Sequence, residues 1–175
     1  RDFSKGQKTR EKIFTFFSNS KKKQIRICSF SERRDSMLMW SHYSDGHKGF
    51  CIEYDFKNNS DVTYYMEPVF YSDKVFDITP YLGINSKRFA IKIAAITKAE
   101  DWKYEQEWRL TFPLSIRDLE KGLYRINAPK AIYLGTRFEE NPIDKKNKFL
   151  KVAEHLNIQV LQMVAHKSEF KIIPA

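Results

Sequence analysis

The stretch from residue 104 to residue 112 constrains the fold most, because polar and apolar side chains alternate along it as they do in a β-strand. One predicted face carries Tyr104, Gln106, Trp108, Leu110 and Phe112, and the other carries Glu105, Glu107, Arg109 and Thr111. The charged face has two interpretations. It is either a solvated sheet face on which Arg109 balances Glu107, or the wall of a cleft where paired carboxylates orient a polar substrate. Alternation alone favours the solvated face.

The chain length is that of one domain with a core of its own. The 175 residues are 42% hydrophobic and 15% aromatic, so no low-complexity or disordered tract stands out. The sequence contains no apolar run long enough to span a bilayer and no signal peptide. The chain opens at Arg1 rather than Met, so we expect an upstream N-terminal segment to be missing from this single domain, residues 1–175.

The net charge of +9 and the pI near 9.4 suit a partner that carries negative charge, such as a nucleic acid or a nucleotide phosphate. The basic residues gather at 21–23, at 33–34 and between 145 and 151. Solvated surface charge explains each of these groups equally well, so composition alone does not identify a partner.

The two cysteines, Cys28 and Cys51, are too few for a disulfide framework and predict a reduced, cytoplasmic protein. Together with His42 and His47 they suggest a zinc site, but the spacing matches no zinc-finger or ribbon pattern. Buried free thiols on strands are the favoured interpretation, and no metal is expected.

Periodicity and turn signals predict an α+β fold with a mixed or mostly antiparallel sheet and helices between the strands. Helices are predicted at 5–18, 36–44, 86–99 and 142–156, and strands at 24–31, 49–56, 62–71, 102–112, 123–126, 131–134, 158–165 and 169–173. The 36–44 helix is apolar on nearly all sides, so we expect it to be buried. Pro68 predicts an edge position or a bulge, and the continuous apolar run at 158–165 predicts a central strand.

A second polar stretch precedes and follows the 36–44 helix. Its candidate binding residues are Ser29, Ser31, Trp40, His42, Tyr43, His47 and Lys48. Five of them have an ordinary structural alternative: strand-end hydroxyls for the serines, a satisfied core position for His42, and core packing for Trp40 and Tyr43. Phosphate-loop, dinucleotide-binding and metalloprotease motifs are absent from the sequence.

Several separated blocks together resemble a known family. They are Ser-Phe-Ser-Glu at 29–32, Met-Trp-Ser-His-Tyr at 39–43, Gly-His-Lys-Gly-Phe-Cys-Ile-Glu at 46–53, and Lys98 through Trp102 to Tyr-Glu-Gln-Glu-Trp-Arg at 104–109. The blocks resemble the bacterial domain-of-unknown-function family 2971, which is akin to AbiGi-type abortive-infection proteins. The resemblance covers most of the chain, and it implies a role in phage defence.

The order of these blocks is similar to that of ADP-ribosyltransferases, which implies an ADP-ribosyltransferase-like fold and NAD as substrate. A late glutamate in those enzymes stabilises the ribosyl cation as nicotinamide leaves. The similarity assigns the essential role to Glu107 and a helper role to Glu105. It also makes Ser29 or Ser31 a cleft support and places Tyr43 or Trp40 near the nicotinamide. A transferase of this kind would modify a protein or nucleic-acid target.

Two other functions stay open at this point. One alternative is a non-catalytic nucleic-acid-binding or regulatory component of an abortive-infection system. The other is a metal-independent nuclease that uses His42 or His47 with Glu107. Convergence of Glu105, Glu107, Arg109, Ser31 and His47 on one pocket would favour the transferase.

Overall fold

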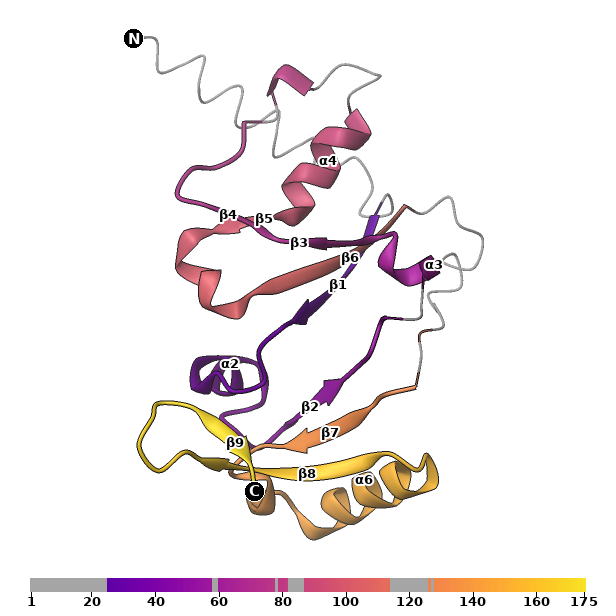
Figure 1. The fold of residues 1–175 in the computed structure, drawn as a ribbon, viewed down its shortest axis with the longest axis vertical. Coiled ribbons are helices and arrows are strands. Elements are labelled where there is room, and N and C mark those ends of the chain that lie inside the picture. Colours follow the sequence, from indigo (N-terminus) through magenta and orange to yellow (C-terminus); the bar gives the residue numbers. More distant parts are fainter. Residues whose placement is uncertain (1–24, 58–59, 78, 82–86, 114–125, 127) are drawn as a thin grey trace. The chain divides into compact units, whose positions relative to one another are not determined.

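A computed structural model describes residues 25–57, 60–77, 79–81, 87–113, 126 and 128–175 (Figure 1). The chain forms two compact units that are both built from non-consecutive segments. Unit 1 is Arg1–Phe30, Tyr65–Lys103 and Glu107–Arg125, and unit 2 is Ser31–Tyr64, Tyr104–Gln106 and Ile126–Ala175. The predicted 5–18 helix, and the 123–126 strand except for Ile126, lie outside the described residues. A single domain over the whole chain stays a prediction.

Unit 1 contains a three-stranded sheet in the order β1-β6-β3. Its strands are β1 (Ile25–Ser31), β6 (Glu107–Pro113) and β3 (Met66–Pro68). Only the last residue of β1, Ser31, belongs to unit 2. β3 pairs with β6 in antiparallel fashion. Pro68 ends β3 at the sheet edge, as predicted, because proline cannot donate a hydrogen bond to a further strand. The central position of β6 explains why Leu110 and Thr111 are buried.

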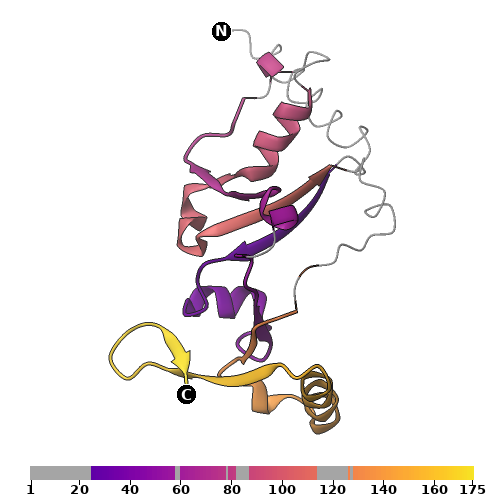
Figure 2. The same ribbon diagram turned by 45° about the vertical axis from the view of Figure 1, so that its right-hand side comes forward.

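A second small sheet and a helix complete unit 1. β4 (Phe70–Ser72) pairs in parallel with β5 (Thr97–Ala99), which follows α4 (Lys87–Ile96) directly (Figures 1 and 2). Ala90 of α4 is fully buried, and Tyr81 of the 3-10 helix η1 (Thr79–Tyr81) packs against Phe89 of α4 at 5.4 Å between ring centroids. The predicted 86–99 helix is therefore confirmed over most of its length.

Unit 2 is organised around a four-stranded sheet in the order β2-β7-β8-β9. Its strands are β2 (Phe50–Glu53), β7 (Ala131–Leu134), β8 (Gln159–Ala165) and β9 (Ile172–Pro174). β7 and β8 are parallel and α6 (Ile143–His155) connects them, whereas the two outer pairings are antiparallel. β8 is a central strand and β9 an edge strand, as the sequence predicts.

Both faces of this sheet are covered, which explains why all four residues of β7 are buried. One face packs Ala131, Tyr133 and Met163 around Trp40 of α2 (Met37–Tyr43). The other packs Ile132, Leu134, Phe138 and Ala153 with Phe149, so α6 covers that side (Figures 1 and 2).

The predicted buried helix at 36–44 is wrong in its burial. α2 begins and ends where predicted, and Ser36 caps it by accepting a hydrogen bond from the N–H of Met39. Of its residues only Trp40 is buried, while Leu38 is 55% and Tyr43 62% exposed. A helix of two turns presents one narrow stripe to a sheet, so its other apolar side chains face outward.

Two predicted strands also differ. The 62–71 strand is divided into α3 (Ser60–Thr63), β3 and β4. The 102–112 strand begins only at Glu107, because residues Glu100–Glu105 form the 3-10 helix η2 and Gln106 has φ of +46°. In β2, Cys51 packs against the core while Phe50 and Ile52 are 44% and 38% exposed, so within this strand the packed face differs from the predicted one.

The predicted α+β class with a mixed, mostly antiparallel arrangement is confirmed. Among the described residues, no helix combines the length and the apolar character that crossing a membrane requires.

Candidate functional site

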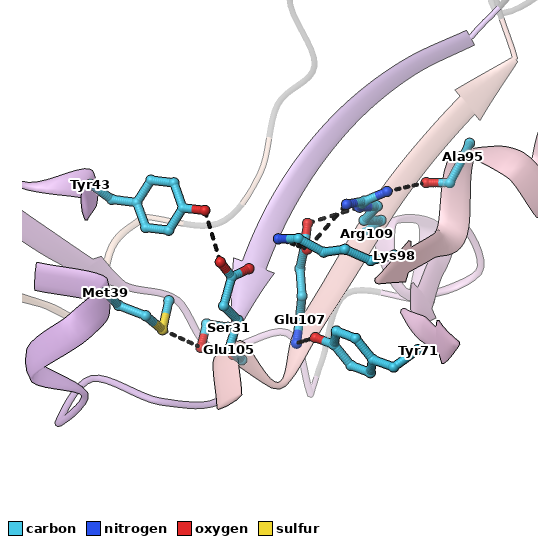
Figure 3. Close-up of polar contacts among 9 residues, drawn as sticks. All are labelled: Ser31, Met39, Tyr43, Tyr71, Ala95, Lys98, Glu105, Glu107 and Arg109. Atoms are coloured by element: carbon cyan, nitrogen blue, oxygen red, sulfur yellow. Dashed lines mark hydrogen bonds and ion pairs between the residues drawn. The ribbon is translucent and has the colours of Figure 1, made fainter. Parts of the chain in front are cut away.

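The centre of the candidate site is the carboxylate of Glu107 in unit 1 (Figure 3). Alternation along β6 puts Glu107 and Arg109 on the same face of the strand, as the sequence predicts. Arg109 donates from Nε to Glu107 Oε1 at 2.8 Å and from a terminal nitrogen to Oε2 at 3.1 Å. Lys98 of β5 adds a third bond, from Nζ to Oε2 at 2.9 Å. Glu107 is thus held by a bidentate guanidinium and an ammonium.

Burial excludes one of the two interpretations of this strand face. The side chain of Glu107 is only 5% exposed, and those of Arg109 and Lys98 are 16% and 19% exposed. The solvated face that alternation favoured is therefore wrong. Burial by itself would raise the pKa of Glu107, but hydrogen bonds from Arg109, Ser29 and Lys98 outweigh it and lower the pKa to about 2. The group is an anion at every physiological pH.

Backbone contacts of unit 1 fix this ion cluster in position. The N–H of Glu107 donates to the hydroxyl of Tyr71 on β4 at 2.8 Å. Arg109 also donates to the carbonyl oxygen of Ala95 at 2.6 Å, in the last turn of α4, where the helix dipole is negative (Figure 3). The Nζ of Lys98 lies 4.9 Å from the ring centroid of Trp102.

Sequence reasoning found part of this cluster. Ser29, Glu107 and Arg109 were candidates, and β1 neighbours β6 in the sheet, which allows Ser29 to hydrogen-bond Glu107. Lys98 opened a motif block but had no assigned role. Nothing in the sequence pointed to Tyr71, because a single hydroxyl on a short strand carries no local signal.

Glu105 has a different environment, within unit 2. It is 3% exposed at the end of η2, and its Oε1 accepts a hydrogen bond from the hydroxyl of Tyr43 at 2.8 Å. The Ser31 hydroxyl donates to the backbone oxygen of Glu105 at 2.5 Å (Figure 3). The left-handed Gln106 interrupts the strand periodicity, so the predicted common strand face for Glu105 and Glu107 is wrong.

The loop that carries His47 and Lys48 is docked onto the connection between β7 and α6. The four successive carbonyl oxygens from Gly46 to Gly49 all accept hydrogen bonds from residues 135–141. Gly135 is required here, because a Cβ at this position would lie 2.0 Å from the backbone oxygen of His47. Lys48 forms an ion pair with Glu140 at 3.4 Å.

The remaining candidates have mixed environments. Trp40 is a core residue whose Nε1 donates to the backbone oxygen of Arg34 at 2.7 Å, in agreement with its structural alternative. His42 is exposed on α2, so the predicted core histidine is wrong. Ser31, Tyr43, His47 and Lys48 belong to unit 2, whereas Glu107 and Arg109 belong to unit 1.

Unit 2 contains a charged cluster of similar composition around Glu53. The carboxylate accepts a hydrogen bond from Tyr133 and pairs with Arg34 at 3.3 Å and with Lys130 at 3.0 Å. Arg34 also lies 5.0 Å from the ring centroid of Tyr133. The hydrogen bond from Tyr133 is the main reason that the pKa of Glu53 is lowered.

The chemistry that the Glu107 cluster offers is that of a fixed buried anion. In the described part of the chain, no group of three or more His, Cys, Asp or Glu side chains could hold a metal ion. Cys28 and Cys51 are free thiols, and Cys28 is exposed rather than buried as predicted. An anionic carboxylate in a low-dielectric site stabilises positive charge that develops beside it.

Comparison with known proteins finds one family model that is similar to part of the chain. No curated protein and no solved structure matches it. The family model described as a protein of unknown function (DUF2971) matches residues 39–110. That range includes α2 from Met39 onward, the His47 loop, Lys98 and the Glu107–Arg109 pair. This match supports the resemblance to the DUF2971 family that the motif blocks indicate.

Proposed function

We propose that this chain is an NAD-consuming, ADP-ribosyltransferase-like protein of bacterial phage defence, in which Glu107 is the essential carboxylate. The observation that carries the proposal is the buried Glu107 anion on β6, hydrogen-bonded by Ser29. Serine and glutamate from two neighbouring strands are the pair that the resemblance to transferases implies.

The required chemistry suits a carboxylate with a strongly lowered pKa. When nicotinamide leaves NAD, the bond between its ring nitrogen and the ribose carbon breaks, and positive charge develops on the ribose. A carboxylate that stays ionised at every working pH stabilises this charge without a proton transfer. A glutamate with an ordinary or raised pKa would serve better as a general acid.

The cations beside Glu107 suit the same substrate class. Arg109 and Lys98 supply a planar fork and a point charge, the two kinds of group that proteins use to bind phosphate oxygens. A dinucleotide offers a diphosphate to such groups and a ribose to the carboxylate. Trp102, next to Lys98, adds an aromatic ring on which a base can stack.

The nucleic-acid-binding alternative has weaker support in unit 2. The α6 helix exposes Lys145, Lys148 and Lys151, but unit 2 as a whole contains 12 basic and 12 acidic side chains. The excess positive charge of the chain therefore lies in the sequence of unit 1. A neutral unit lacks the electrostatic footprint that binds phosphate backbones without sequence specificity.

The test is nicotinamide release from NAD by the wild-type chain and by Glu107→Gln, Glu107→Asp and Glu53→Gln. Glu107→Asp keeps the negative charge but withdraws it by one methylene. It therefore separates a loss of catalysis from a loss of folding stability. We expect release by wild type and Glu53→Gln, and a loss of at least about 100-fold in both Glu107 variants. Circular dichroism of every sample reports whether it is folded.

Absence of release by the folded wild type, with cell extract supplied as acceptor, would contradict the proposal. Equal release by a folded Glu107→Asp variant would remove Glu107 from the reaction. Salt-sensitive binding of nucleic acid by a wild type that releases no nicotinamide would favour the alternative.

A further inference from the structure

A serine and a histidine in unit 2 form a contact that the proposed function does not use. The Oγ of Ser41, on α2, lies 3.0 Å from Nε2 of His47 in the following loop. Ser41 is exposed and His47 half-buried, so a small molecule can reach the hydroxyl. Both residues fall within the range matched by the family model.

The backbone holds His47 in an unfavourable conformation. Its φ is +70°, and Asp45 and Gly46 before it are also left-handed, with φ of +50° and +57°. A non-glycine residue in this region costs about 1 kcal/mol or more and persists only where the surroundings impose it. Here the carbonyl bonds of residues 46–49 impose it, so the loop fixes the imidazole against Ser41.

The protonation state of His47 suits a base. Burial, reinforced by the nearby charge of Arg137, lowers the pKa of His47 below its ordinary 6.5. The ring is therefore neutral at pH 7. Nδ1 is buried and has no hydrogen-bond partner among the described residues, so no carboxylate orients the ring. Activation by such a pair belongs at the lower end of the range for general-base catalysis, about 100-fold.

The Ser41 hydroxyl also has a second contact, which would give it a purely structural role within the helix. It donates to the backbone oxygen of Met37, one helical turn earlier, at 2.9 Å. A hydroxyl has one proton, so Ser41 donates either to Met37 or to His47 at any moment. Only the second arrangement makes the oxygen nucleophilic, and the 3.0 Å separation requires no movement of either residue to reach it.

We propose that Ser41 is an activated nucleophile, with His47 as its base, that reacts with small electrophilic esters. Ser41 Oγ attacks the carbonyl carbon while its proton passes to His47 Nε2. The alkoxide leaves with that proton, and water then hydrolyses the acyl-serine. This activity is independent of NAD and of Glu107.

A fluorophosphonate probe tests the proposal, because it phosphonylates activated serines with loss of fluoride. The intact wild-type chain is treated at pH 7.5, and the rate of labelling at each serine is measured by peptide mass spectrometry. Ser168 is the internal control: it is near His166, but there the imidazole accepts from the backbone N–H of Ser168. We expect Ser41 to react about 100 times faster than Ser168.

Variants then separate activation from exposure. His47→Gln is expected to lower the Ser41 rate about 100-fold, Ser41→Ala to abolish the fast label, and Glu53→Gln to leave it unchanged. Equal rates at Ser41 and Ser168 in the wild type would overturn the proposal. So would an unchanged Ser41 rate in a folded His47→Gln chain. If that variant fails to fold, the internal comparison in the wild type decides.

Discussion

Each unit of this chain surrounds one glutamate with an arginine, a lysine and a hydroxyl, yet the two clusters differ in burial. Around Glu107 the three charged side chains are 5–19% exposed. Around Glu53 the carboxylate is 24% exposed, and its cations Arg34 and Lys130 are 52% and 63% exposed. The same chemical groups therefore meet solvent to very different degrees.

The comparison shows that burial, rather than the identity of the partners, decides how much an ion cluster contributes to stability. Water screens the Glu53 cluster, and such pairs contribute about 1 kcal/mol or less. The Glu107 cluster has lost its hydration, so each member depends on the others. A site that must keep one carboxylate ionised away from water requires the second arrangement.

Removal of the carboxylate should produce the largest difference. Glu107→Gln leaves Arg109 and Lys98 as buried cations without their anion, and we expect it to lower the free energy of unfolding by about 3–5 kcal/mol. The cations of Glu53 are already in contact with water, so Glu53→Gln should cost about 1 kcal/mol. Urea unfolding of both variants measures this. Equal losses would contradict the comparison.

Acid should produce the next largest difference. The pKa of Glu107 is about 2 in the folded chain and near 4.5 in the unfolded chain. The unfolded state therefore takes up a proton first as the pH falls. Wild type should lose about 3 kcal/mol of unfolding free energy between pH 4.5 and pH 2 through this group.

Stability curves measured from pH 6 to pH 2 for wild type, Glu107→Gln and Glu53→Gln check this. The acid-dependent loss should be smaller by that amount in Glu107→Gln and largely retained in Glu53→Gln. A Glu107→Gln curve that parallels wild type would show that Glu107 titrates normally.

Replacement of the arginines should sharpen the comparison. Arg109→Lys keeps the charge but loses the bidentate fork, so it cannot hold Glu107 and the Ala95 carbonyl together, and we expect a cost of about 1–2 kcal/mol. Arg34→Lys should cost less than about 0.5 kcal/mol. Thermal unfolding of the two variants separates these values. A larger loss of stability in Arg34→Lys than in Arg109→Lys would contradict the view that the buried cluster contributes more to stability.

Loss of the hydroxyls should have the smallest effect and should differ little between clusters. Ser29→Ala and Tyr133→Phe each remove one hydrogen bond to a carboxylate that keeps both of its cations, so each should cost about 1 kcal/mol. Chemical denaturation resolves a difference between them. A cost of several kcal/mol for Ser29→Ala would show that the hydroxyl, rather than the cations, stabilises the Glu107 carboxylate most.

The sequence predicted the parts of this arrangement that depend on local periodicity. Helical spacing found α6 from Pro142, and alternation put Glu107 and Arg109 on one strand face. Alternation failed at Gln106, because a single left-handed residue leaves no mark on the pattern of side chains. Burial of the charged face was also missed, since Lys98 and Tyr71 reach Glu107 from two other strands, β5 and β4, whose position beside β6 the alternation does not reveal.

The most direct test of the account is a carbon-13 NMR titration of the Glu107 side-chain carboxylate, assigned by comparison with Glu107→Gln. Both the stability difference and the proposed stabilisation of a ribosyl cation depend on this group staying ionised. We predict a pKa of about 2, so that the resonance does not shift between pH 7 and pH 4. A pKa near 4.5 or above would contradict the account, because Glu107 would then be neither tightly paired nor reliably anionic.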